Sequence, residues 1–121
     1  MRNQPKYTII NNTKYALNGL KDIYKHETSF RLEIFIIIFL SIVLWFFPFS
    51  FTNKALLQIS LFLPLLVETI NSSIERVVDL VTKDYHELAK TAKDAGSAAV
   101  FISICITTAI WLAVVINELL Y

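Results

Sequence analysis

Two long stretches without a charged residue decide the fold: residues 34–51 (IFIIIFLSIVLWFFPFSF) and residues 95–117 (AGSAAVFISICITTAIWLAVVIN). A helix needs about 20 consecutive apolar residues to cross a bilayer, so each stretch is predicted to span a membrane. Between them, residues 55–67 are apolar for about half a crossing, and the helix-like pattern continues past Glu68 to Val81. We therefore predict an all-α membrane protein with three transmembrane helices.

The composition agrees with this fold class and excludes several functions. Of the 121 residues, 55% are hydrophobic and 17% are charged, against about 45–50% and 25% in an ordinary soluble domain. The formal charge of +1 gives no field that would recruit nucleic acid. The single cysteine, Cys105, excludes a disulfide framework and a Cys-rich metal site. One membrane domain over residues 1–121 is expected, with no signal peptide to remove.

The positive charges predict the orientation, because Lys and Arg are enriched on the cytoplasmic side of membrane proteins. They lie before the first span, once after it, and around the second connection: Arg2, Lys6, Lys14, Lys21, Lys25 and Arg31, then Lys54, then Arg76, Lys83, Lys90 and Lys93. The N-terminus and the 82–94 connection are therefore expected in the cytoplasm. The 48–54 turn and the C-terminus are expected on the outer face.

Residues that favour the start or the end of a helix give approximate helix bounds of 6–26, 28–48, 53–81 and 85–118. Pro48 is expected to end the first membrane helix and Thr52 to cap the second. Asp84 with Glu87 three residues later has the form of a capping box for the third. Before the first span, apolar residues recur at helical spacing at Ala16, Leu20, Ile23 and Tyr24. This pattern predicts an amphipathic helix on the inner membrane surface.

Polar residues form one line along the second membrane helix. Glu68, Asn71, Glu75 and Asp79 are spaced so that the carboxylates of Glu75 and Asp79 lie within roughly 20° of the direction of Glu68 around the helix. From residue 55, at about 1.5 Å per residue, Glu68 lies roughly 20 Å inward and Glu75 roughly 30 Å. An ionisable group at such depth normally faces a bundle interior or a wet cavity and is functional by default.

This acidic stripe favours phosphoryl transfer to a lipid. The carboxylate of Glu68 could accept the proton of a hydroxyl buried at the interface, and Glu75 could hold a divalent metal on a polyphosphate. Lys93 could neutralise phosphate charge from the cytoplasmic side. The placement suggests a lipid acceptor and a water-borne donor. Gly19 and Gly96 are the only glycines, so a Walker A loop and a kinase glycine-rich loop are both excluded.

Three further residues allow two interpretations each. Pro64 lies four residues before Glu68, where its missing N–H could open space beside the stripe or serve packing alone. Arg76 is expected to snorkel or to pair across a subunit boundary rather than to act in catalysis. Asp79, at the cytosolic edge, could either pair with a cation or take part in the chemistry.

The stripe belongs to a longer motif that closely resembles the prokaryotic diacylglycerol kinase family. Residues 68–79 read ETINSSIERVVD and are followed by YHELA at 85–89 and AKDAGSAA at 92–99. Glu27 and the FRLE segment at 30–33 join the pattern, which covers essentially the whole chain. The resemblance implies a surface helix and three membrane helices per subunit. It also implies a homotrimer with composite active sites in the bacterial inner membrane, using ATP with Mg²⁺ to phosphorylate diacylglycerol.

The resemblance also implies individual roles. Glu68 is similar to the family's catalytic base, and Glu27 and Glu75 to its metal-binding carboxylates. The positions that resemble its ATP contacts are Tyr15, Glu27, Asn71, Glu75, Asp84, Tyr85, His86, Lys93 and Asp94. The positions that resemble its lipid contacts are Ser29, Arg31, Glu33, Glu68 and Ser97. Thr8 and Leu32 depart from the pattern, standing where better-known members have a basic residue and a glutamine.

Other functions remain as alternatives. Related enzymes that phosphorylate undecaprenol share the ERVVDLV stretch at 75–81, whereas Glu33 and the GSAA run at 96–99 resemble the diacylglycerol branch. A small ion- or proton-conducting oligomer would also use buried carboxylates, but the acidic and basic groups gathered at the inner interface favour gripping a nucleotide. A purely structural assembly protein would leave the depth of Glu68 unexplained.

Overall fold

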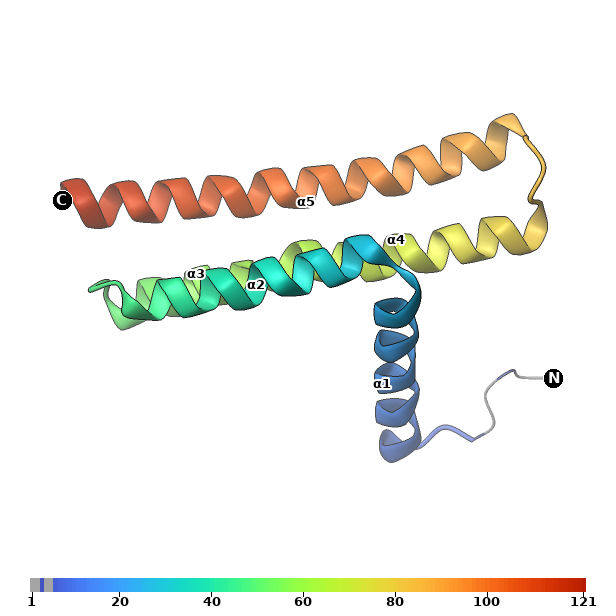
Figure 1. The fold of residues 1–121 in the computed structure, drawn as a ribbon, viewed down its shortest axis with the longest axis horizontal. Helices are drawn as coiled ribbons and strands as arrows, with labels where there is room; N and C mark the ends of the chain where they lie inside the picture. The colour runs from blue at the N-terminus through green and yellow to red at the C-terminus, as the bar shows by residue number, and fades with distance from the viewer. Residues whose placement is uncertain (1–2, 4–5) are drawn as a thin grey trace.

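The computed structural model describes residue 3 and residues 6–121, and these residues form five α-helices (Figure 1). The helices are α1 (Ile9–His26), α2 (Thr28–Phe46), α3 (Phe51–Ser60), α4 (Phe62–Val81) and α5 (Glu87–Leu120). The helices α2 to α5 run along the long axis of the molecule, and α1 projects sideways from the junction with α2 (Figure 1). The main packing is between α4 and α5, with α2 lying against α3 and α4. The expected all-α architecture is confirmed.

Three segments are long and apolar enough to cross a membrane, as the sequence predicted. They are Thr28–Phe46, Phe51–Val81 and Glu87–Leu120, with α3 and α4 together making the second. Only 11%, 33% and 17% of the residues in their most apolar windows are buried within the chain. One copy of the chain therefore leaves most of its apolar surface uncovered, as expected of a protein in contact with lipid or with other subunits.

The ends of the first two helices follow from local chemistry. Thr8 is the N-cap of α1, and its hydroxyl accepts a hydrogen bond from the backbone N–H of Asn11 at 3.1 Å, which starts the helix at Ile9 rather than near residue 6. Helix α2 ends at Phe46, two residues before the expected bound, because Pro48 favours an extended backbone at Phe47 (φ −76°, ψ 146°).

Two predicted helix caps are wrong. Ser50, not Thr52, caps α3, since its hydroxyl accepts a hydrogen bond from the Asn53 N–H at 3.3 Å. His86, not Asp84, caps α5, since its Nδ1 accepts from the Leu88 N–H at 3.1 Å. A cap must directly precede the first helical turn, and Asp84 instead lies in the connection, where its own N–H donates to the Thr82 hydroxyl at 3.1 Å.

A single helix over 53–81 was predicted for the second membrane segment, but the structure divides this segment into two helices, α3 and α4. The helix is interrupted at Leu61, between α3 and α4, three residues before Pro64. Proline lacks the N–H that would bond to the carbonyl one turn earlier, so an interruption here has a direct cause.

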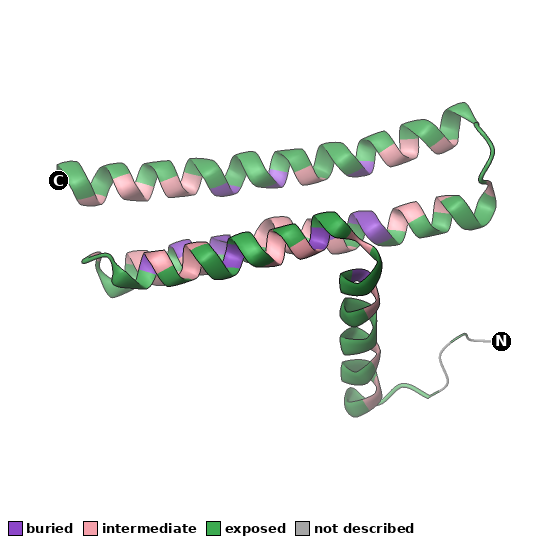
Figure 2. Cartoon of the chain, in the orientation of Figure 1, coloured by how far each residue is buried: buried purple, intermediate pink, exposed green. Residues whose placement is uncertain are grey.

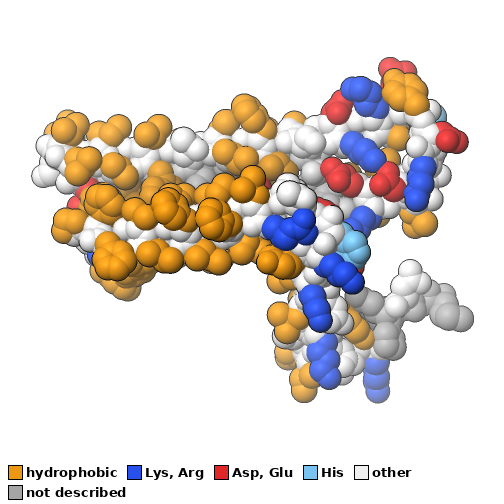
Figure 3. Space-filling model, viewed as in Figure 1, with side chains coloured by type: hydrophobic (Ala, Val, Ile, Leu, Met, Phe, Trp, Pro, Cys, Tyr) orange, Lys and Arg blue, Asp and Glu red, His pale blue; other side chains and the backbone are white. Residues whose placement is uncertain are grey.

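The distribution of side chains divides the molecule into an apolar and a charged end. Buried residues lie on the faces that the helices turn toward one another (Figure 2). Hydrophobic side chains cover the end that carries α2, α3 and the C-terminal part of α5, whereas charged side chains gather over the 82–86 connection and along α1 (Figure 3). On α1, Ile23 is buried while Leu20 and Tyr24 stay exposed. The location of helix α1 on the membrane surface stays a prediction.

Candidate functional site

The acidic stripe lies on α4 and passes from buried to exposed along the helix. Glu68 and Asn71 are 7% and 6% exposed, Glu75 is half-buried, and Asp79 is exposed. The helical spacing expected from the sequence therefore places one carboxylate inside the helix packing and one at the charged end. This gradient is what a site shared by a membrane-embedded and a water-borne reactant needs.

Helix α2 holds the buried carboxylate of Glu68. The hydroxyl of Ser29, in the first turn of α2, donates a hydrogen bond to Glu68 Oε1 at 2.9 Å, although the two residues are 39 positions apart in the chain. The side chain of Glu68 is thereby oriented by a hydroxyl rather than neutralised by a cation. A carboxylate held in this way keeps a lone pair for a further proton donor.

Glu27, between α1 and α2, is tied to the same face of α4. Ser72, 1% exposed, donates a hydrogen bond to Glu27 Oε2, and an Arg76 guanidinium nitrogen lies 3.6 Å from Glu27 Oε1. Arg76 also forms an ion pair with Asp22 of α1 at 2.5 Å. Arg76 thus pairs within its own chain. Ser72 and Asp22 were not singled out by the sequence analysis, because their partners are distant in sequence.

Asn71 lies at the contact between α4 and α5. Its side-chain amide donates to Glu75 Oε1 at 3.4 Å, and its Oδ1 is buried without a hydrogen-bond partner among the described residues. Opposite it, a Cβ added to Gly96 would lie 3.2 Å from Asn71 Cγ and would overlap the Oδ1. Gly96 is therefore what lets Asn71 fit between the two helices.

The connection between α4 and α5 forms a groove of about 340 Å³. Its lining includes four of the predicted nucleotide positions: Asp84, Tyr85, His86 and Lys93. The Lys93 ammonium contacts Asp79 at 2.6 Å, and Lys90 pairs with Asp94 at 2.6 Å on the exposed side of α5. The structure thus brings these four residues together, whereas Asp94 and Tyr15 of α1 are not among the residues that line the groove.

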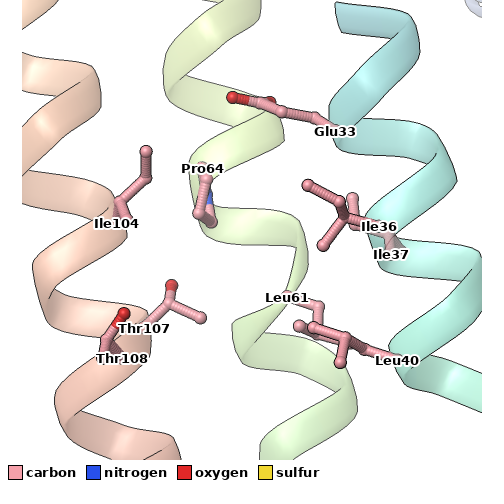
Figure 4. Close-up of a pocket in the computed structure, with 9 residues that line it drawn as sticks. All are labelled: Glu33, Ile36, Ile37, Leu40, Leu61, Pro64, Ile104, Thr107 and Thr108. Carbon is pink, nitrogen blue, oxygen red and sulfur yellow. The ribbon is translucent and has the colours of Figure 1, made fainter. Parts of the chain in front are cut away.

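The structure brings only some of the predicted lipid-side residues together: Ser29 contacts Glu68, whereas Arg31 and Ser97 lie elsewhere. Glu33 lines an apolar cavity of about 220 Å³ between α2, α4 and α5 (Figure 4), and its Oε2 is buried without a partner in the part of the chain that the structure describes. Arg31 instead caps the C-terminus of α1, donating to the carbonyls of Tyr24 and Lys25 at 2.8 and 3.0 Å. Ser97 is exposed on α5.

The carboxylates suit a metal that is shared with a substrate. Over residues 6–121 the structure holds no group of three or more His, Cys, Asp or Glu side chains arranged around one point. Mg²⁺ in phosphoryl-transfer sites is commonly held by one or two carboxylates together with substrate phosphates and water. Glu27 and Glu75 carry carboxylate oxygens of the kind that Mg²⁺ prefers, so their chemistry fits the group. Glu27 would have to exchange its contacts with Ser72 and Arg76 for the ion.

The chain has three segments able to span a membrane, a buried carboxylate on the second of them, and a charged groove at one end of the helices. These features define an integral membrane protein with a polar site at one end of its helices. Residues 14–115 match the family model described as prokaryotic diacylglycerol kinase. The chain belongs to this family, which confirms the resemblance drawn from its motifs.

Curated relatives agree over most of the chain. The Haemophilus influenzae protein named diacylglycerol kinase is 42% identical to this chain, over 85% of this chain and 87% of the relative. The Pseudomonas aeruginosa protein of that name is 35% identical over 90% and 89%, and the Escherichia coli K12 protein 36% identical over 85% and 84%. The chain and these relatives therefore match over nearly their full lengths.

Proposed function

We propose that this chain transfers the γ-phosphate of ATP to the hydroxyl of diacylglycerol, giving phosphatidic acid and ADP at the cytoplasmic membrane interface. The observation that carries the proposal is the buried carboxylate of Glu68 on a membrane-spanning segment, oriented by Ser29 at 2.9 Å. Membership of the diacylglycerol kinase family supports the choice of acceptor.

At the lipid end, Glu68 acts as the general base. As its carboxylate accepts the proton of the lipid hydroxyl, the hydroxyl oxygen attacks the γ-phosphorus and the bond from that phosphorus to the β,γ-bridging oxygen breaks. Ser29 holds Glu68 in place. Glu33 and Ser97 face the lipid, and Arg31 acts by fixing the junction between α1 and α2, where it caps the carbonyls of α1.

At the nucleotide end, the charged residues of α4, the connection and α5 hold ATP. The proposed ATP-binding positions are Tyr15, Glu27, Asn71, Glu75, Asp84, Tyr85, His86, Lys93 and Asp94. The grouping of Lys93 with the 84–86 connection around one groove supports this assignment. On binding, the Lys93 ammonium exchanges its contact with Asp79 for a phosphate oxygen, which retains a charge-assisted hydrogen bond.

Glu27 and Glu75 would hold Mg²⁺ on the polyphosphate, where the ion offsets the negative charge of the phosphate oxygens. Both carboxylates are partly exposed, whereas Glu68 is buried. The same chain thus separates a metal-nucleotide end from a lipid end.

The proposal includes the assembly and the orientation. We place the chain in the bacterial inner membrane as a homotrimer, with α1 on the cytoplasmic surface, the N-terminus in the cytoplasm and the C-terminus in the periplasm. The distribution of Lys and Arg supports this orientation. The apolar surface that one copy leaves uncovered supports self-association.

The test is transfer of labelled γ-phosphate from ATP by the purified protein in lipid micelles, with diacylglycerol and undecaprenol offered separately. Diacylglycerol should be labelled preferentially. Preferential labelling of undecaprenol would move the same chemistry to another lipid alcohol. Labelling of neither lipid would refute the kinase and favour a conducting oligomer.

The assignment of the base needs a paired comparison of Glu68→Gln with Glu118→Gln. Glutamine keeps the volume of Glu68 and removes its basicity, so turnover should be lost while the protein still folds. Glu118 lies at the other end of the helices, where it accepts hydrogen bonds from Ser50 and Asn53, and its variant should keep turnover. Full turnover in Glu68→Gln would remove Glu68 from the mechanism.

A further inference from the structure

The backbone carbonyl of Ser60 is deprived of its normal partner and has gained another. In a regular helix this oxygen would accept a hydrogen bond from the N–H of residue 64, but Pro64 has none. The hydroxyl of Thr107, on α5, donates to the Ser60 carbonyl at 3.0 Å. Nearby, the indole N–H of Trp111 donates to the Ser60 hydroxyl at 3.1 Å. Two side chains of α5 thus hold the point where α3 ends.

This contact is buried and lies in the membrane-spanning part of the chain. Ser60 and Thr107 are 7% and 8% exposed. A carbonyl left free inside a bilayer cannot turn to bulk water, and a hydroxyl donor on a neighbouring helix is one way to satisfy it. The Thr107 hydroxyl therefore substitutes for the N–H that Pro64 cannot supply.

The same place is adjacent to the buried carboxylate of the site. Pro64 is four residues before Glu68, so the two residues lie one helical turn apart on the same face of α4. Pro64, Thr107 and Glu33 line one cavity, in which Pro64 lies between α2 and α5 (Figure 4). A change in how α4 starts against α5 would thus be transmitted directly to the direction of Glu68.

We propose that Thr107 is a positioning residue for the phosphoryl transfer. Its hydroxyl bonds to the Ser60 carbonyl, fixes the start of α4 at the Pro64 interruption, and holds Glu68 in line with the lipid hydroxyl. This inference rests on the proposed function, because it assigns to Glu68 the role of base.

The test is a double-mutant cycle between positions 64 and 107, with turnover in lipid micelles as the readout. Thr107→Val keeps the shape of the side chain and removes the hydroxyl, and kcat should fall about three- to tenfold while the KM for ATP stays unchanged. Thr107→Ser keeps the hydroxyl and should retain kcat. In a Pro64→Ala background the backbone N–H at position 64 is restored, so Thr107→Val should have little further effect.

Thr108→Val is the matched control. Thr108 is the next residue of α5 and lines the same cavity, but it is exposed and its hydroxyl is not the donor to Ser60. Its variant should keep kcat. Equal losses in Thr107→Val and Thr108→Val, or an undiminished loss in the Pro64→Ala background, would overturn the role of Thr107.

The cycle separates this inference from the proposed function. Loss of turnover in Glu68→Gln together with an additive cycle would overturn the role of Thr107 alone. Retained turnover in Glu68→Gln would refute the proposed base, and with it the reason for positioning that side chain.

Discussion

Gly96 gives the sharpest prediction about how the site is packed. In the variant Gly96→Ala the new methyl group would lie 3.2 Å from Asn71 Cγ and would overlap Asn71 Oδ1. Asn71 is only 6% exposed and is enclosed where α4 packs against α5. Either the helices separate or the Asn71 side chain turns away from the site.

The magnitude follows from two opposing effects. Alanine is favoured over glycine in a helix interior by about 1 kcal/mol. Forcing a methyl group into a packed contact costs about 1–3 kcal/mol. The net expectation is a loss of stability of up to about 2 kcal/mol, together with reduced turnover because Asn71 is displaced.

Gly19→Ala is the matched control. No atom lies within 4 Å of a Cβ added at Gly19 on α1, so the propensity effect acts alone and the variant should be at least as stable as the wild type. The assay is the free energy of unfolding in micelles, measured with the kinase turnover of the same samples. The double variant Gly96→Ala, Asn71→Ala removes the overlapping amide and should recover stability but not turnover.

The result that would refute this reasoning is a Gly96→Ala protein that unfolds like Gly19→Ala and keeps full turnover. It would mean that Asn71 has room to move, and that the close approach of α4 and α5 at this point does not define the site.

Three further predictions concern the charged end and the surface helix. Glu75→Gln should raise the Mg²⁺ concentration needed for half-maximal turnover, because one hard oxygen ligand loses its charge; an unchanged Mg²⁺ dependence would contradict the metal assignment. The coupling between Asp22→Asn and Arg76→Gln in unfolding free energy should be about 0.2–1 kcal/mol and should shrink in high salt, because the pair is half exposed; a salt-independent coupling would show that more than charge is involved. Thr8→Ala should cost about 1 kcal/mol of unfolding free energy while Thr8→Ser costs little, since the hydroxyl caps α1; equal effects of the two changes would show that the cap contributes nothing.

Much of the fold is readable from the sequence because membranes impose a simple rule. A segment in hydrocarbon must satisfy its backbone internally and expose apolar side chains, so residues 34–51 and 95–117 show themselves as uncharged runs. The acidic stripe is readable for a similar reason, since helical periodicity alone aligns Glu68, Glu75 and Asp79.

The residues at which individual helices begin were harder to predict. Thr52 and Asp84 have side chains suited to capping, yet Ser50 and His86 are the caps. Which of several nearby polar residues caps a helix depends on where the preceding turn leaves the chain, and at Ser50 that position is also fixed by a hydrogen bond to Glu118 of α5, which is distant in sequence.

The sequence by itself determined the three membrane segments, the alignment of the carboxylates and the family. Only the tertiary structure decided which side chains hydrogen-bond to these groups. Ser29 donates to Glu68, Ser72 donates to Glu27, and Thr107 donates to the Ser60 carbonyl that Pro64 leaves free. The physical reason is range. Periodicity and hydrophobicity act along one segment, whereas each of these hydrogen bonds joins residues about 40 positions or more apart, and so exists only once the helices have packed.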